Sequence, residues 1–110
     1  MRRGEIRWYT FAAPDKRRPV LILTRNSALS FLTSITVAPI TTTVRDIPSE
    51  VLLTPQEDGT PQLCVVNADN VQTIQKAQLG ALITTLTPQR MADVEQALCF
   101  ALGMDGLFAR

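Results

Sequence analysis

RRPVLILTRN, residues 17–26, shows most clearly how this chain is built. Its centre is an uninterrupted apolar run from Val20 to Leu23, and such a run beside a proline is typical of a strand that is covered on both faces. Arg17 and Arg18 place two fixed positive charges directly before this run. Burial explains the apolar residues but not the charges. The stretch therefore predicts a buried strand that begins beside a bound anion.

The chain around this strand is small. Its 110 residues, of which 45% are hydrophobic, are enough for one core, and we expect a single domain over residues 1–110. No apolar stretch approaches the roughly 20 residues that span a bilayer, and no signal-peptide core follows the charged N-terminus. We therefore expect a soluble, cytoplasmic protein that does not contact a membrane.

Residues that bind transition metals are scarce. The chain has no histidine, and its two cysteines, Cys64 and Cys99, lie in the apolar segments LCVV and ALCF at no metal-ligand spacing. This pattern predicts buried free thiols rather than a disulfide or a zinc site. We expect no metal and no other cofactor.

The net charge of +1 conceals an asymmetry. Residues 1–45 hold eight basic and two acidic side chains, whereas residues 46–110 hold three basic and eight acidic ones. Such a division suits binding of a polyanion by the first part and self-association or partner docking by the second. For Arg2, Arg3 and Arg7, solvation of an ordinary surface is an equally good explanation.

Short strands and one late helix account for the rest of the chain. Besides residues 19–24, strands are predicted at residues 4–11, 34–40, 50–53, 62–66, 71–74 and 81–86. The intervening segments are predicted to be turns at residues 12–17 and 58–59, a helical turn at 27–32 and a polar loop at 41–49. Pro39 lacks an N–H donor, so it should lie at a sheet edge or a bulge. This spacing is typical of a small barrel or sandwich.

The helix is predicted after Thr87. This threonine can cap it, Pro88 fits the first helical position, and Gly103 ends the run. An apolar stripe with helical spacing lies between them, formed by Met91, Val94, Leu98, Ala101 and Leu102.

Six segments in register carry a family resemblance. They are RGEI, RRPVLIL, VAPITT, PSEVLL, VVNADNVQTIQKAQLG and LTPQRMADVEQALCFALGM. Together, from Arg3 to about Met104, they resemble the MazF/PemK (Kid) toxins of bacterial type II toxin–antitoxin systems. The resemblance implies a mainly β fold, an SH3-like barrel of the MazF/CcdB/Kid type with a C-terminal α-helix and short helical turns. It also implies a homodimer, a metal-independent and sequence-selective endoribonuclease for single-stranded RNA, and a cognate MazE-like antitoxin with a flexible acidic tail.

The resemblance assigns two catalytic residues. Arg18 stands at the family's catalytic arginine, where it would stabilise the phosphorane formed when the ribose 2′-hydroxyl attacks the adjacent phosphate. Protonation of the leaving oxygen is a further candidate role for it. Thr41, the first threonine after VAPI, stands at the catalytic threonine and could bind the phosphate or the 2′-hydroxyl. An ordinary surface arginine at a strand entrance is the alternative for Arg18.

The general base is less clear, because the family histidine is absent and the loop AAPDKR is short. Asp15 is the carboxylate in that loop, and Asp69 stands where one branch of the family has a candidate base. In that branch an arginine occupies the position of Asn67. Asp69 could equally hold a turn through backbone amides, and Glu50 is interpreted as a structural or antitoxin-facing residue.

Further polar residues are candidates for gripping RNA. They are Lys16, Arg17, Thr42, Thr43, Arg45 and Asn67. For Thr42 and Thr43 a hydroxyl-rich turn is the favoured interpretation. Trp8 and Tyr9 offer planes for base stacking, but a strand tryptophan in a small domain more often belongs to the core.

Two rival functions come from other classes. A CcdB-like toxin poisons DNA gyrase by contact, but that activity depends on a tryptophan-containing C-terminal end, whereas this chain closes with GMDGLFAR. A non-catalytic SH3-like module that binds nucleic acid or protein is the second rival, and the missing base favours it.

Overall fold

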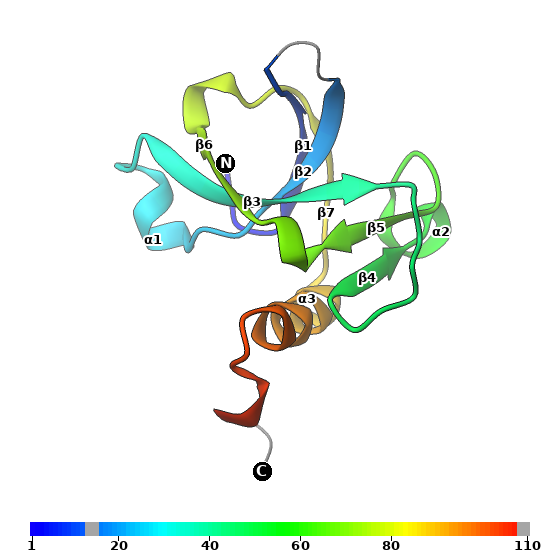
Figure 1. Cartoon of the computed structure of the whole chain (residues 1–110). Coiled ribbons are helices and arrows are strands. Elements are labelled where there is room, and N and C mark those ends of the chain that lie inside the picture. The colour runs from blue at the N-terminus through cyan, green and yellow to red at the C-terminus, as the bar shows by residue number, and fades with distance from the viewer. Residues whose placement is uncertain (13–15, 108–110) are drawn as a thin grey trace.

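The strand predicted from residues 17–26 lies in the middle of one curled sheet (Figure 1). The computed structural model describes residues 1–12 and 16–107. Its strands are β1 (Glu5–Thr10), β2 (Arg17–Ile22), β3 (Ser34–Thr41), β4 (Glu50–Leu53), β5 (Cys64–Asn67), β6 (Gln72–Gln75) and β7 (Leu82–Thr85). Its helices are α1 (Asn26–Leu29), α2 (Pro55–Asp58) and α3 (Pro88–Ala101), with short 3₁₀ turns η1 (Ala68–Asn70), η2 (Lys76–Gln78) and η3 (Asp105–Leu107).

The sheet is antiparallel throughout and remains open. Its strand order is β4-β5-β3-β2-β1-β7, and β6 adds a second partner to β3. Strand β3 pairs with β6 from Ser34 to Val37 and with β5 at Ile40 and Thr41. The resulting half-barrel, with α3 against one side of it, confirms the predicted mainly β fold with a C-terminal helix (Figure 1).

The position of Pro39 differs from the sheet edge or bulge that its missing N–H predicts. It lies inside the sheet, opposite Val20 of β2, and not on an edge strand. On the other side of β3 it falls between the residues that pair with β6 and those that pair with β5. A residue without an N–H is tolerated there because no partner strand needs its hydrogen bond.

Side-chain alternation divides the core into two clusters, one on each face of the sheet. On one face, Leu21 and Ile40 pack with Met91 and Val94 of α3. On the other face, Val20 packs in a smaller cluster, whose buried members also include Ile22, Leu29, Ile35, Val37 and Ile74. The strand of residues 17–26 is therefore covered on both faces, as its apolar run predicts.

Helix α3 confirms the prediction of its start. The hydroxyl of Thr87 accepts a hydrogen bond from the Arg90 N–H at 3.1 Å, and Pro88 is the first helical residue. Met91 and Val94 are buried as expected, whereas Leu102 lies beyond the end of the helix and is 60% exposed. Among the described helices, none has the length and apolar character needed to cross a bilayer.

One element escaped prediction, and one thiol is less buried than expected. Helix α2 has a capping Thr54, a first-position Pro55 and a left-handed Gly59, but its four residues are too few to show a helical period. Cys64 is buried, Cys99 is only half-buried, and both are free thiols.

Candidate active site

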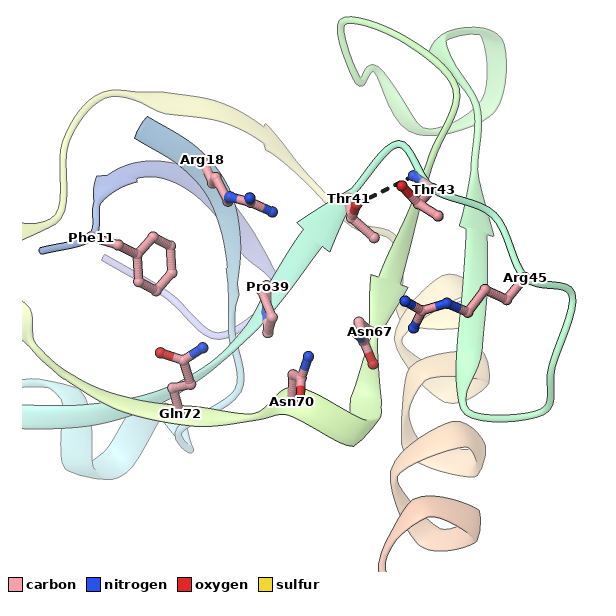
Figure 2. Close-up of a pocket in the computed structure, with 9 residues that line it drawn as sticks. All are labelled: Phe11, Arg18, Pro39, Thr41, Thr43, Arg45, Asn67, Asn70 and Gln72. Atoms are coloured by element: carbon pink, nitrogen blue, oxygen red, sulfur yellow. Dashed lines mark hydrogen bonds between the residues drawn. The ribbon is translucent and has the colours of Figure 1, made fainter. Parts of the chain in front are cut away.

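Two hollows meet where β2 begins and β3 ends, and the predicted catalytic residues lie there. We call the first the amide hollow, of about 340 Å³, lined by Phe11, Arg18, Pro39, Thr41, Thr43, Arg45, Asn67, Asn70 and Gln72 (Figure 2). We call the second the tryptophan hollow, of about 480 Å³, lined by Trp8, Lys16, Arg17, Arg18, Pro19, Ile40, Thr41, Thr42, Thr43, Pro61, Gln62 and Cys64. Arg18, Thr41 and Thr43 line both, so they form the ridge between the hollows.

The hollows continue the two faces of the sheet. Arg18 lies two residues before Val20, on the face of the smaller core cluster, and Gln72 lies on that face of β6 two residues before Ile74. Trp8 follows Ile6 on the opposite face, which carries the larger cluster. The strand period of two thus places Gln72 in the amide hollow and Trp8 in the tryptophan hollow.

The two predicted catalytic side chains are brought together and carry free donors. Arg18 is exposed, and no carboxylate in residues 1–12 or 16–107 forms an ion pair with it. The Thr41 hydroxyl oxygen accepts the Thr43 N–H at 3.2 Å (Figure 2), so the Thr41 hydroxyl proton remains available to an anion. A guanidinium fork and a hydroxyl on one ridge form a suitable site for a phosphate group.

Arg45 reaches the amide hollow from the loop between β3 and β4 (Figure 2). Glu50 holds the base of this loop, because its Oε1 atom accepts the Arg45 N–H at 2.8 Å. The next residue, Asp46, has a left-handed φ of 55°, which turns the chain sharply after Arg45. Glu50 therefore has a structural contact, in keeping with one of the two interpretations given to it.

Asn67 is a buried amide whose orientation is fixed. It is 7% exposed, and its Oδ1 atom accepts the Asp69 N–H at 3.0 Å. Its Nδ2 group is therefore the part of the amide left for a ligand in the hollow. Lys16, Arg17 and Thr42 line the tryptophan hollow instead, so the predicted RNA contacts all lie beside Arg18 and Thr41 but on two sides of them.

Within the described part of the chain, no candidate base lies on the ridge. The Asp69 carboxylate accepts the Ser49 hydroxyl at 2.5 Å and does not line either hollow. Its carboxylate thus has a structural contact, although with a hydroxyl and not with the backbone amides of the second interpretation. Asp15 lies outside the described residues. Among the residues that the structure describes, neither hollow is lined by a carboxylate.

Comparison with known proteins identifies the family. The model of the family described as PemK-like, MazF-like toxin of type II toxin–antitoxin system matches residues 2–102. The chain belongs to this family. It is 48% identical over 89 residues to the endoribonuclease MazF3 of Mycobacterium tuberculosis, covering 81% of this chain and 82% of that protein.

Solved structures of MazF toxins share the fold. The Mycobacterium tuberculosis toxin MazF-mt6 is 40% identical, with a TM-score of 0.82 over 92% of this chain and 98% of that chain. An endoribonuclease solved with its cognate antitoxin, from a Mycobacterial species, is 31% identical, with a TM-score of 0.82 over 94% and 96% of the two chains. The predicted MazF/PemK family and the predicted enzyme class, an endoribonuclease, are confirmed by these matches.

Several polar and aromatic lining residues of this MazF-like fold were not predicted as parts of a site, among them Gln62 of the tryptophan hollow. For Trp8 the core was favoured over base stacking, but it is half-buried, lines the tryptophan hollow and has the Arg17 guanidinium 4.3 Å from its ring centroid. Phe11, Asn70 and Gln72 line the amide hollow, although their neighbours in sequence give no sign of it. The alternation of side chains along a strand places Phe11 and Gln72 on the same face of the sheet as Arg18, but only once the pairing of the strands is known.

Proposed function

We propose that this protein is a toxin that cleaves single-stranded RNA at selected sequences, without a metal ion, and that a cognate antitoxin neutralises it. The scissile phosphate binds on the ridge between the two hollows, with one flanking nucleotide in each hollow. The single observation that carries this proposal is the convergence of Arg18 and Thr41, each with unengaged donors, on that ridge.

The chemistry is an internal transfer at phosphorus. The ribose O2′ loses its proton and attacks the adjacent phosphorus, the bond from phosphorus to O5′ breaks, and O5′ takes up a proton. The products are a 2′,3′-cyclic phosphate and a 5′-hydroxyl. Arg18 stabilises the extra negative charge of the phosphorane, and the Thr41 hydroxyl donates to a phosphate oxygen.

The cations of the chain replace a metal ion in this proposal. The described lining has no carboxylate to hold a hard cation such as Mg²⁺, and Arg18 and Arg45 supply the positive charge directly. Asp15, in the loop directly before Arg17 and Arg18 in the sequence, is the candidate base that we retain. The contact between Asp69 and Ser49 favours a structural role for Asp69.

Residues 1–110 form one toxin domain in this proposal, and two copies associate. Exposed apolar side chains such as Phe100, at 47%, and Leu102, at 60%, favour burial against another chain. An acidic, flexible antitoxin tail is complementary to the cationic side chains that line the two hollows, and its binding there would exclude RNA. Light scattering that gives the mass of a monomer at micromolar concentration would contradict the dimer.

The decisive test is cleavage of a long single-stranded RNA in EDTA. We expect discrete cuts with cyclic-phosphate and 5′-hydroxyl ends, and a loss of rate on the order of 10²-fold in Arg18→Ala. Arg25→Ala is the matched control, because Arg25 is exposed, bonds Ser27 and lines neither hollow.

Each rival function predicts a different result. A mobility shift without cutting would favour a non-catalytic binding module. Equal cutting by the wild type and Arg18→Ala would remove Arg18 from the catalytic step. Cuts that disappear in EDTA and return with Mg²⁺ would contradict the metal-free mechanism.

A further inference from the structure

The amide hollow has two unlike walls. Arg18 and Arg45 supply positive charge, whereas Phe11 and Gln72 lie across the hollow from Arg45, with Asn70 beside Gln72 (Figure 2). A phosphate requires only the first wall. The side chains of the second wall carry no charge. They therefore suit a part of the substrate other than the phosphate.

Phe11 offers a ring that is held in place. Its ring contacts Tyr9 edge to face, with 4.8 Å between centroids and 77° between planes. The Tyr9 hydroxyl in turn donates to the Oε1 atom of Gln78 at 3.1 Å. Phe11 is only half-buried, so this fixed ring presents apolar surface to the hollow. Unpaired bases stack on such rings in single-stranded RNA recognition.

Gln72 and Asn70 add hydrogen-bonding groups beside that ring. Both are exposed, and neither amide bonds another residue within the described ranges. A terminal amide carries a donor and an acceptor side by side, so it can pair with the edge of a base, whereas a phosphate offers acceptors only. Gln75, on the same strand, differs in that its amide is engaged with Ser34 and does not line the hollow.

We propose that this wall is a base-reading pocket, in which one RNA base stacks on Phe11 while Gln72 and Asn70 bond its edge and Arg18 holds the adjacent phosphate. The inference rests on the proposed function and assigns part of the sequence selectivity to residues 11, 70 and 72. Gln62, in the tryptophan hollow, serves the nucleotide on the other side of the phosphate.

The test separates base reading from cleavage. A randomised single-stranded RNA pool with 2′-fluoro ribose, which lacks the nucleophile, is selected on immobilised protein and then sequenced. We expect the wild type to enrich one base at a fixed position, and Gln72→Met to lower that enrichment about tenfold, the lower part of the range for one lost base contact. Gln75→Met is the matched control and should keep the wild-type enrichment.

The outcomes distinguish the two proposals. Gln62→Met should alter a different position from Gln72→Met, which supports separate hollows. If Gln72→Met keeps the wild-type base preference at every position, or if the wild type enriches no base, the base-reading pocket is overturned. Cleavage of an ordinary RNA pool then tests the nuclease independently, because a protein that enriches a base but cuts nothing supports the pocket and contradicts the enzyme.

Discussion

Two arginines of this toxin, Arg90 and Arg18, lie in contrasting environments. Arg90 bridges helices α2 and α3 through three carboxylates, at 2.9 Å from Asp58, 3.1 Å from Asp93 and 3.2 Å from Glu57. Arg18, on the ridge between the hollows, has no carboxylate partner among residues 1–12 and 16–107. The same side chain therefore serves as an internal cross-link in one region and as an open anion site in the other.

Carboxylate partners change both the pKa of a guanidinium and its availability to a ligand. Hydrogen bonds from the Arg90 guanidinium to Asp58, together with the nearby negative charges, raise the pKa of Arg90 above its usual value even though burial opposes this. Such a group is committed to the fold. An arginine without a carboxylate adds little to stability, but it keeps its donors for a substrate.

Breaking the cross-link should have the largest effect on stability. Asp58 has a buried side chain, which also accepts the Thr54 N–H at 2.9 Å. Asp58→Ala should lower the free energy of unfolding by about 3 kcal/mol, because it removes the Arg90 pair and leaves the Thr54 amide unpaired. Urea denaturation measures this loss, while RNA cleavage per folded molecule should not change. The control is Asp93→Ala, because Asp93 is a half-exposed partner of Arg90, and this change should cost less than about 1 kcal/mol of unfolding free energy. An equal loss in both variants would mean that the burial of Asp58 adds nothing to stability.

Gly59 tests the same region through its backbone. It has a φ of +74°, and an added Cβ atom would lie 2.8 Å from the Thr84 hydroxyl oxygen, which donates to the Asp58 carbonyl. Gly59→Ala should therefore cost about 2 kcal/mol, from backbone strain together with a displaced hydrogen bond. Gly103→Ala isolates the strain, because its φ is +72° and nothing lies within 4 Å of the added atom. Thermal unfolding that gives equal losses would show that the contact with Thr84 is unimportant.

A conservative change at the ridge should affect activity but not stability. Arg18→Lys keeps the charge and loses the fork, so the cleavage rate should fall about tenfold, the equivalent of one charge-assisted hydrogen bond. The melting temperature should stay within experimental error, because Arg18 has no carboxylate partner to lose in the described structure. An unchanged rate would mean that charge alone suffices on the ridge.

The smallest expected effect concerns pH. Burial alone would raise the pKa of Glu5, but hydrogen bonds from Arg7 and the Arg2 backbone, with the Arg7 charge, lower it overall. A carboxyl with a lowered pKa stabilises the fold above its unfolded pKa, and this contribution is lost as the pH falls through the folded pKa. Urea unfolding should show wild type more stable than Glu5→Gln at pH 7, by less than about 1 kcal/mol, and the gap should close by pH 3. A gap that is independent of pH would contradict this account.

Local sequence patterns predicted the strands, the start of α3 and the positive charge at the start of β2. These features depend on neighbours within a few residues, as with Thr87 and Pro88. The amide wall could not be predicted in the same way, because Gln72 reaches Arg18 only through β3, which pairs with both β2 and β6. The Ser49 contact that occupies Asp69 spans twenty residues of sequence and is equally invisible to a local pattern.

The two-faced ridge also bears on how such toxins diverge. Trp8 and Gln62 line only the tryptophan hollow, and Phe11 and Gln72 line only the amide hollow, so a single substitution at any of them alters one hollow. None of these substitutions replaces Arg18 or a buried core residue, although Phe11 also packs against the smaller core cluster. If each hollow binds one nucleotide, preference on either side of the cut can evolve one base at a time, while the reaction centre is inherited unchanged.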